Sequence, residues 1–346
     1  MSVDLANPIL SVLARRKTAR PPVWFMRQAG RHLPEYLEVR AKAKDFLDFC
    51  YSPSLATEAT LQPIRRYGMD AAILFADILL ILDALGLEVR FEAGVGPLVE
   101  KVEAPQRLDK VPPHIVADKL SPVYETVERV RSQLGPETAL IGFAGAPWTV
   151  ALYAIEGRGG TEKTEARLWA YQAPDDLDAV LSILVEATAH YLKAQADAGA
   201  QVLMLFESWA EGLPEAVFQR IVVEPNKALV SRLRALGVKA PIIGFPRGAG
   251  AMVGAYVAET GVDLVGLDTA AVPAHVNAAL PEGYPVQGHL DPLLLVAGGD
   301  ALDQGVRALI ESYRDRPHIF NLGHGVRPET PIAHVERAVT LVKGEV

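Results

Sequence analysis

The chain of 346 residues has the composition of a globular protein, with half of its residues hydrophobic and 22% charged, which excludes disorder as a global description. Its formal net charge of −8 argues against nucleic acids and anionic membranes as general partners. Its single cysteine, Cys50, excludes an intramolecular disulfide, a four-thiolate zinc site and a cysteine-ligated iron–sulfur cluster within one subunit.

Positive charge is concentrated near the N-terminus. Residues 5–34 contain no acidic side chain and carry six basic ones, which are Arg15, Arg16, Lys17, Arg20, Arg27 and Arg31. A basic segment on an acidic protein predicts a local anion site. The basic residues follow the short apolar stretch of the N-terminus instead of preceding it. This order is the reverse of a secretory signal, so we expect a cytoplasmic protein.

Short apolar runs alternate with helical patterns along the chain. The eight runs are residues 23–26, 72–77, 140–145, 202–208, 242–246, 264–268, 285–291 and 318–325. Because they are hydrophobic almost throughout, they predict strands buried on both faces of a parallel sheet. The longest apolar segment, residues 71–87, contains Asp77 and Asp83. It therefore predicts a strand followed by a buried helix and not a membrane span.

Two of the intervening helices have clear boundaries. Ser52-Pro53 is typical of a helix start, and Gly68 is typical of its end. From Asp175 to Gly199, hydrophobic or uncharged side chains recur at spacings of three and four residues. This spacing predicts a second, amphipathic helix that leads into the next strand.

Alternating strands and helices predict an α/β fold, either a doubly wound sheet or a (β/α)8 TIM barrel. Eight buried runs with polar residues at their ends favour the barrel, whose active site lies at the C-terminal ends of the strands. Residues 88–111 interrupt the alternation and predict a small β-hairpin. No linker or repeat divides the chain, so we expect one domain over residues 1–346, with residues 1–20 as an N-terminal extension.

The most distinctive local motif is Pro-Val-Trp-Phe-Met-Arg-Gln-Ala-Gly-Arg at residues 22–31. Arg27 and Arg31 are four residues apart around Gln28 and Gly30, so two guanidinium groups and an amide can converge on carboxylates. The glycine permits close approach of the backbone. A solvated basic turn is the alternative.

A second motif, residues 142–157, places small residues at a strand end before an aromatic helix that contains Tyr153. Its hydroxyl could face a cavity or be satisfied within the core. Asp77, Ser208 and His324 each follow an apolar run. Asp77 could serve as a helix N-cap or as a functional carboxylate that needs partners in apolar surroundings.

Common cofactor motifs are missing from the sequence. There is no complete dinucleotide fingerprint, no Gly-x-x-x-x-Gly-Lys-Ser/Thr and no His-Glu-x-x-His. The eight histidines are scattered without metal-ligand spacing. The sequence therefore offers no recognised motif for a nucleotide cofactor or a metal ion.

Taken together, the motifs resemble those of the uroporphyrinogen decarboxylase family. The runs at residues 22–31 and 142–157 look like its two signatures, and Ile-Leu-Phe-Ala-Asp-Ile, Phe-Glu-Ser-Trp-Ala, Gly-Phe-Pro-Arg-Gly, Gln-Gly-x-Leu-Asp-Pro and Asn-Leu-Gly-His-Gly occur in the family's order. The similarity spans about residues 5–340. It implies a TIM barrel, usually a homodimer, that converts the four acetate groups of uroporphyrinogen III to methyl groups. The products are coproporphyrinogen III and carbon dioxide, and no cofactor is needed.

The resemblance also implies roles for individual residues. Arg27, Gln28 and Arg31, with the backbone of Ala29 and Gly30, would bind substrate carboxylates, and Arg40 matches a further basic position. Asp77 would receive the pyrrole N–H groups, and Tyr153, Ser208 and His324 would complete the pocket. Catalysis would involve Asp77, Arg27, Tyr153 and His324, with the proton donor left open among the last three.

Four residues depart from the family pattern. They are His289 in place of Asn, Glu211 in place of Gly, His32 in place of Tyr and Gly160 in place of Ser. Two other functions remain as alternatives. One is a zinc-dependent corrinoid or coenzyme M methyltransferase of the same superfamily, and the other is a non-catalytic tetrapyrrole-binding protein.

Overall fold

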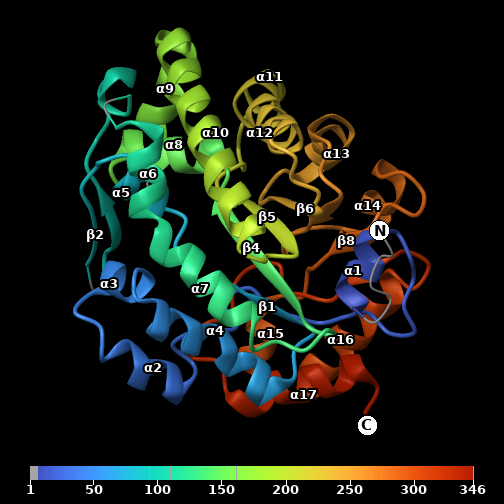
Figure 1. Cartoon of the computed structure of the whole chain (residues 1–346). Helices are drawn as coiled ribbons and strands as arrows, with labels where there is room; N and C mark the ends of the chain where they lie inside the picture. Colours follow the sequence, from blue (N-terminus) through green and yellow to red (C-terminus); the bar gives the residue numbers. More distant parts are fainter. Residues whose placement is uncertain (1–6, 93, 110, 161, 346) are drawn as a thin grey trace.

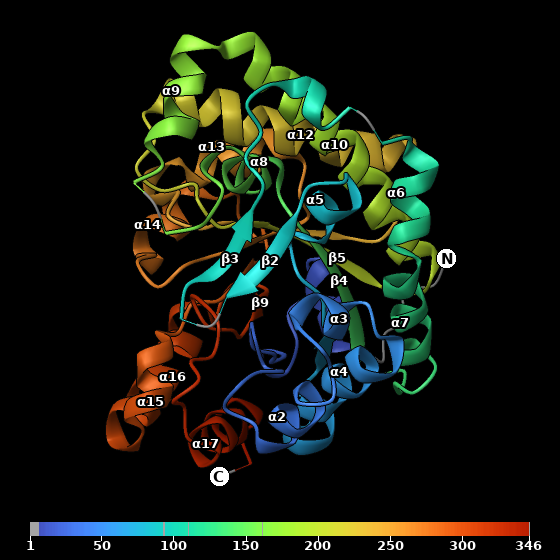
Figure 2. The same cartoon turned by 90° about the vertical axis from the view of Figure 1, so that its left-hand side faces the viewer.

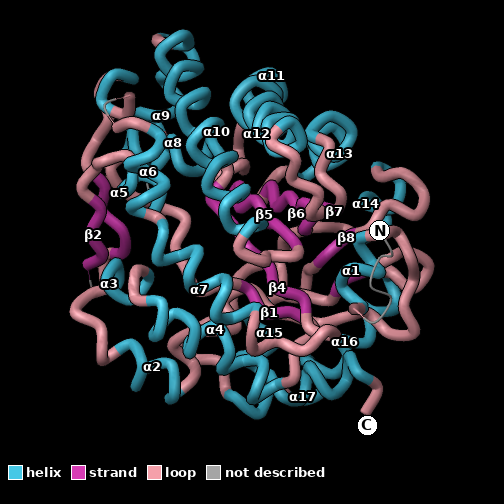
Figure 3. The backbone as a smooth tube through the Cα atoms, in the orientation of Figure 1, coloured by secondary structure: helices cyan, strands magenta, loops and turns pink. Residues whose placement is uncertain are grey.

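A curved ring of parallel strands forms the centre of the structure, a computed structural model that describes residues 7–92, 94–109, 111–160 and 162–345 (Figures 1 and 3). Seven strands pair side by side, each parallel to the next. In ring order they are β1 (Ala71–Ile73), β4 (Ala139–Gly145), β5 (Val202–Glu207), β6 (Ile242–Pro246), β7 (Leu264–Gly266), β8 (Val286–Gln287) and β9 (His318–Ile319). The predicted TIM-barrel-like α/β fold is confirmed.

The segment around Val23 closes the ring between β9 and β1. On one side, Phe320 N–H donates to the Pro22 carbonyl at 2.8 Å and Trp24 N–H donates to the Phe320 carbonyl at 3.3 Å. On the other side, Asp70 N–H donates to the Val23 carbonyl at 2.9 Å. Val23 thus takes the eighth position of the barrel.

The predicted strand over residues 23–26 is shorter than expected, because only Val23 forms a bridge to a neighbour. Phe25 N–H donates to the side-chain carbonyl of Gln28 at 3.1 Å, and Met26 N–H donates to that of Asn321 at 3.0 Å. Side chains, instead of an adjacent strand, satisfy these backbone donors, so the chain leaves the ring and turns.

Helices surround the ring (Figure 1). They are α1 (Pro8–Leu13), α2 (Pro34–Arg40), α3 (Phe46–Cys50), α4 (Pro53–Tyr67), α5 (Leu80–Ala84), α6 (Pro113–Lys119), α7 (Ser121–Arg131), α8 (Pro147–Glu156), α9 (Thr164–Gln172), α10 (Pro174–Asp197), α11 (Glu215–Phe218), α12 (Glu224–Ala235), α13 (Val253–Thr260), α14 (Pro273–Ala279), α15 (Pro292–Ala297), α16 (Gly299–Ser312) and α17 (Ile332–Lys343). Short turns of other helix types are η1 (Pro105–Arg107), η2 (Gln219–Val223) and η3 (Gly250–Met252). Within the described residues, no helix has the length and hydrophobicity needed to cross a membrane.

Both helices with predicted boundaries are confirmed. α4 begins at Pro53 and ends at Tyr67, where Gly68 takes a left-handed conformation with φ of 60°, as a C-terminal glycine does. α10 runs from Pro174 to Asp197 and buries its apolar face.

The predicted hairpin is also present, as the antiparallel pair β2 (Val89–Glu92) and β3 (Gly96–Val99), which faces the viewer in Figure 2. The end of β3 meets the loop after α8, because Val99 N–H donates to the Gly157 carbonyl at 2.7 Å. The hairpin therefore lies beside the loop that follows β4 and α8.

The basic N-terminal segment does not act as one patch, contrary to expectation. Arg20 pairs with Asp70 at 2.8 Å, Lys17 lies 3.6 Å from Asp315, and Arg15 lies 5.5 Å from the ring centre of Tyr284. Asp70, Tyr284 and Asp315 precede β1, β8 and β9, so these cations lie at the N-terminal end of the barrel. Arg27 and Arg31 come after the chain has passed through the ring at Val23.

A buried carboxyl group, that of Glu207 at the end of β5, connects the ring to the helices around it. It accepts hydrogen bonds from the hydroxyl of Thr149 on α8 and, at 3.1 Å, from the amide of Asn226 on α12. Burial raises the pKa of Glu207 to about 7, and its hydrogen bonds offset part of that rise. Glu207 thus ties α8, which carries Tyr153, to β5.

Glu207→Gln should remove a pH dependence of stability. Because its pKa is raised, Glu207 contributes its full stabilisation at pH values below its ordinary pKa of 4.5. This contribution is lost as the pH rises through about 7. Between pH 5 and pH 8, the free energy of unfolding of the wild type should therefore fall relative to that of the variant, by as much as about 3 kcal/mol. Urea unfolding across this range measures the difference.

Glu186→Gln is the matched control for this experiment. Arg232 and His190 lower the pKa of Glu186, and its side chain is half exposed, so its effect should be small and of the opposite sign. If the difference in unfolding free energy between the wild type and Glu207→Gln does not change with pH, the raised pKa assigned to Glu207 is wrong.

Candidate active site

Side chains that follow several strands, most of them predicted site residues, meet at one end of the ring. Because the strands are parallel, the residues after their C-terminal ends share one face of the barrel. Asp77 follows β1, Tyr153 lies on α8 after β4, Ser208 follows β5, Arg247 follows β6 and His324 follows β9. We call this face the barrel mouth.

Arg27 enters the mouth from the turn that follows Val23, where its own φ is 60°. A Cβ on Gly325 would lie 2.3 Å from the Cδ of Arg27. The Arg27 side chain therefore packs against the loop after β9, and only glycine leaves room for it there. This contact brings the guanidinium next to His324.

Gln28 holds the turn together. Its side chain is 1% exposed. The amide carbonyl accepts from Phe25 N–H at 3.1 Å, and the amide nitrogen donates to the Ala71 carbonyl of β1 at 3.0 Å. The oxygen and the nitrogen of the Gln28 amide thus both form hydrogen bonds with the backbone. The side chain thereby fixes the positions of the neighbouring residues Arg27 and Ala29.

Ala29, Gly30 and Arg31 continue the turn toward α2. Ala29 and Gly30 are half-buried, and a Cβ on Gly30 would lie 2.9 Å from the Arg27 carbonyl oxygen. Arg31 is exposed and, within the described part of the chain, forms no hydrogen bond or ion pair. Its guanidinium is available to an external anion.

Asp77 combines a capping role with an electrostatic one. Its Oδ1 accepts a hydrogen bond from Leu79 N–H at 2.8 Å, just before α5. Burial raises the pKa of Asp77 to about 6, while the Leu79 N–H and the positive charge of Arg27 limit the rise. Asp77 is therefore mostly ionised at pH 7.

Tyr153 lies among the charged groups of the mouth. Its ring contacts Trp209 edge-on, with ring centres 6.2 Å apart. Burial raises the pKa of Tyr153, and the charges of Asp77, Arg27 and Arg247 act on it. A Cβ on Gly159 would lie 2.7 Å from the Tyr153 hydroxyl oxygen, so this glycine leaves the space that the hydroxyl occupies.

His324 is held as a neutral imidazole. Gly325 N–H donates to its Nδ1 at 2.6 Å, which assigns the remaining proton to Nε2. Although the side chain is partly solvent-accessible, desolvation and the charges of Arg27, Arg247 and Arg327 lower its pKa to about 4. At pH 7 the ring therefore offers one N–H donor.

Ser208 and Arg247 join the loops after β5 and β6. Arg247 Nη1 donates to the Ser208 carbonyl at 2.8 Å, and the Ser208 side chain is half-buried. Arg247 belongs to the sequence motif Gly-Phe-Pro-Arg-Gly, from which no role for it was predicted. Its position directly after an apolar run is the signal that could have identified it.

Arg40 lies at the end of α2 and contacts α3. Its guanidinium lies 5.9 Å from the ring centres of both Phe46 and Phe49 on α3. The charge of Arg27 acts on Asp77, on Tyr153 and on His324, but that of Arg40 acts on none of the three. Arg40 and Arg31 both act on the pKa of Tyr36, and Arg40 and Asp77 both act on that of Cys50, so Arg40 shares neighbours with two of the predicted site residues.

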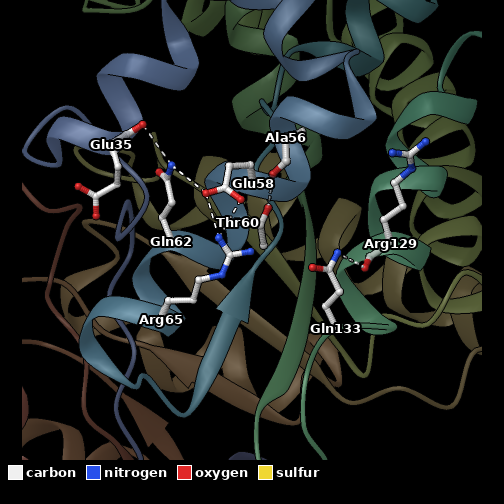
Figure 4. Close-up of polar contacts among 8 residues, drawn as sticks. All are labelled: Glu35, Ala56, Glu58, Thr60, Gln62, Arg65, Arg129 and Gln133. Atoms are coloured by element: carbon white, nitrogen blue, oxygen red, sulfur yellow. Dashed lines mark hydrogen bonds and ion pairs between the residues drawn. The ribbon is translucent and has the colours of Figure 1, made fainter.

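An outer groove of about 320 Å³ lies between α4 and α7 and is unrelated to the mouth (Figure 4). Its lining residues are Ser54, Thr57, Glu58, Leu61, Arg65, Arg129, Ser132 and Gln133. Glu58 pairs with Arg65 at 2.8 Å, and Arg129 accepts a hydrogen bond from Gln133 through its carbonyl. None of the predicted site residues lines it. Among the described residues, no three or more His, Cys, Asp or Glu side chains gather as metal ligands.

Comparison with known proteins identifies the family. A family model described as uroporphyrinogen decarboxylase (URO-D) matches residues 5–344. The chain is 67% identical over 323 residues to the uroporphyrinogen decarboxylase of Hyphomonas neptunium, covering 93% of this chain and 94% of that protein. The chain belongs to the uroporphyrinogen decarboxylase family. A second member, from Maricaulis maris, is 51% identical over 97% of both chains.

Solved structures support the barrel fold of this family member. A methyltransferase from Methanosarcina mazei superposes with a TM-score of 0.78 over 98% of both chains, at 18% identity. A B12-independent methionine synthase from a Shewanella species gives a TM-score of 0.53 over 84% of this chain and 89% of the other, at 9% identity. At these identities the likeness concerns the fold alone.

Arg27→Gln should raise the pKa of two groups at once. Arg27 lowers the pKa of both Asp77 and His324, so its loss should move that of Asp77 above about 6 and that of His324 upward from about 4 toward its ordinary 6.5. NMR titration of labelled carboxyl and imidazole carbons measures both. Arg40→Gln is the matched control and should change neither. Unchanged titrations in Arg27→Gln would show that Arg27 does not face these groups.

Proposed function

We propose that the chain decarboxylates the four acetate side chains of uroporphyrinogen III to methyl groups, giving coproporphyrinogen III and carbon dioxide. The observation that carries the proposal is the ionised Asp77 beside Arg27 at the mouth of a barrel. The family membership supports it, since relatives with 67% and 51% identity carry the name of this decarboxylase.

The chemistry requires a place for the electrons left when carbon dioxide departs. Enzymes commonly supply it with a cofactor, but the pyrrole ring of the substrate can serve instead. Protonation of a pyrrole α-carbon produces a cationic ring, and loss of carbon dioxide neutralises it. A second proton then completes the methyl group, and release of the first proton from the α-carbon restores the aromatic pyrrole. We therefore propose catalysis without a metal or organic cofactor.

Asp77 supplies the negative charge that this cation needs. Its carboxylate is half-buried and oriented by the Leu79 N–H, so it is preorganised toward the mouth. A fixed charge in a site that excludes water stabilises a transient opposite charge. The pyrrole N–H groups of the flexible macrocycle can converge on this carboxylate, whereas those of a flat, oxidised porphyrin cannot.

The arginines of the turn bind the substrate carboxylates. Arg31 has no partner among the described residues, and Arg27 is exposed toward the mouth. Each guanidinium can form a bidentate pair with a carboxylate. Gln28 supports them by fixing the turn and presenting the backbone of Ala29 and Gly30. Arg40, packed on α3, contributes as a more distant basic residue.

Proton transfer falls to Arg27, Tyr153 or His324. A guanidinium has a pKa above roughly 12 and is a reluctant acid, so Arg27 would act through a substrate carboxylate that relays the proton. Tyr153 has a raised pKa and keeps its proton. His324 carries its proton on Nε2 and can donate a hydrogen bond, as Ser208 can from the facing loop.

We also propose the organisation of the protein in the cell. The chain acts as one domain over residues 1–346, as a homodimer in the cytoplasm. The predicted N-terminal extension, residues 1–20, includes α1, while residues 1–6 lie outside the described part of the chain. A zinc-dependent methyltransferase is not favoured, since the likeness to a solved methyltransferase stops at 18% identity.

An anaerobic assay with chromatography of the products tests the function. The wild type should release carbon dioxide and form heptacarboxyl to tetracarboxyl products, whereas a tetrapyrrole carrier would return the substrate unchanged. Asp77→Asn should lower kcat on the order of a hundredfold to a thousandfold, the loss typical of a preorganised charge. The wild-type kcat should also fall below about pH 6, as Asp77 becomes protonated.

Asp291→Asn is the matched control. Asp291 accepts a hydrogen bond from Leu293 N–H at 2.9 Å, two residues ahead, as Asp77 does from Leu79. The control therefore removes a carboxylate with the same capping geometry and should keep near-normal turnover. Near-normal turnover in a folded Asp77→Asn protein would rule out the role of Asp77.

A further inference from the structure

A second cationic surface faces the turn of Arg27 and Arg31 across the mouth. The ring has eight positions, counted as β1, β4, β5, β6, β7, β8, β9 and the Val23 segment. β6 is four positions from the Val23 segment, so Arg247, directly after β6, lies opposite Arg27. The charges of Arg247 and Arg27 both act on Tyr153 and on His324, which places both cations at the same mouth.

Lys163 and Arg247 share one aromatic support. The Nζ of Lys163 lies 4.6 Å from the ring centre of Trp209, and the guanidinium carbon of Arg247 lies 5.9 Å from it. Trp209 in turn contacts Tyr153 edge-on. The two cations are thus held beside a proposed catalytic residue by contacts with a single ring.

Glu211 supplies a carboxylate to this pair of cations. Its Oε1 forms an ion pair with Lys163, while its Oε2 lies 3.9 Å from Arg247 Nη1, too far for a hydrogen bond. Oε2 is buried and has no hydrogen-bond partner among the described residues. Glu211 also stands where the family pattern has glycine, so the sequence adds a carboxylate to this wall.

Arg247 retains capacity to bind a carboxylate. The one hydrogen bond from its side chain to a described residue uses Nη1, toward the Ser208 carbonyl, whereas a guanidinium has five N–H donors. Its side chain is 32% exposed. The pairing of Glu211 with Arg247 is incomplete, and a buried oxygen without a hydrogen bond is unfavourable. A carboxylate that lies closer to Arg247 can therefore bind its remaining N–H donors, and Glu211 competes with it only weakly.

We propose that Arg247, with Lys163 beside it, forms a second carboxylate-binding site for the substrate, and that Glu211 competes for this site until a substrate carboxylate displaces it. The inference rests on the proposed function, because it assigns the site to uroporphyrinogen III. A substrate with carboxylates around its whole rim engages both walls of the mouth. A smaller carboxylate reaches only one wall and binds more weakly.

Equilibrium dialysis of uroporphyrinogen III under anaerobic conditions tests the site, with Asp77→Asn as the background so that binding is measured without rapid turnover. Adding Arg247→Gln should raise Kd on the order of tenfold to a hundredfold, as expected for loss of a charged hydrogen-bonding partner. Adding Glu211→Gln should lower Kd several-fold, because a neutral amide competes poorly with a carboxylate. Arg247→Lys keeps the positive charge but cannot form a bidentate pair with a carboxylate. Its Kd should therefore lie between that of the background and that of Arg247→Gln.

Arg327→Gln is the matched control. Arg327 also acts on the pKa of His324, but its guanidinium pairs with Glu329 on the exposed rim. The Kd of Arg327→Gln should stay within about twofold of the background, because the variant removes an exposed charge that is already paired. Circular dichroism of each variant confirms that the barrel is folded.

The outcomes separate the two proposals. An unchanged Kd in Arg247→Gln overturns the second site. A raised Kd in Arg247→Gln without tighter binding in Glu211→Gln supports the second site but overturns the competition by Glu211. Failure of the wild type to release carbon dioxide refutes the proposed function, and the dialysis still reports whether the second site binds the octacarboxylate.

Discussion

The closure of the barrel at Val23 is the constraint on which the site depends. Asp70, one residue before β1, accepts hydrogen bonds from Val23 N–H at 2.7 Å and from both terminal nitrogens of Arg20. The opposite edge of Val23 meets Phe320 beside β9. This arrangement carries the chain from the N-terminal end of the barrel to the mouth, where the next turn delivers Arg27 between the loops after β1 and β9.

Arg27 then sets the charge state of its surroundings. Its positive charge limits the rise in the pKa of Asp77 and lowers that of His324. An ionised carboxylate and a neutral imidazole therefore coexist near pH 7 in a partly desolvated site. Both groups have lost their titratable proton at this pH, so Asp77 carries the negative charge that stabilises a cation, while the neutral His324 keeps one N–H to donate a hydrogen bond.

The opposite wall of the mouth is built from a different part of the chain. Trp209, Glu211 and Arg247 come from the loops after β5 and β6, and Glu207 anchors β5 to α8 from within the core. The Glu207 carboxyl group thus lies in the core, whereas the Arg247 guanidinium lies at the barrel mouth. One fixes the helix that carries Tyr153, and the other places charge at the entrance.

Local sequence patterns determined the helices α4 and α10, the hairpin β2–β3 and the alternation that indicates a barrel, because capping residues and hydrophobic spacing act over a few residues. The motifs also determined the family. Only the tertiary structure decided which cations share a site. Arg15, Lys17 and Arg20 are close to Arg27 in sequence yet lie at the other end of the barrel, while Arg247 is distant in sequence and lies opposite it. Such neighbours follow from strand order and ring closure, which depend on hydrogen bonds between residues far apart in the chain.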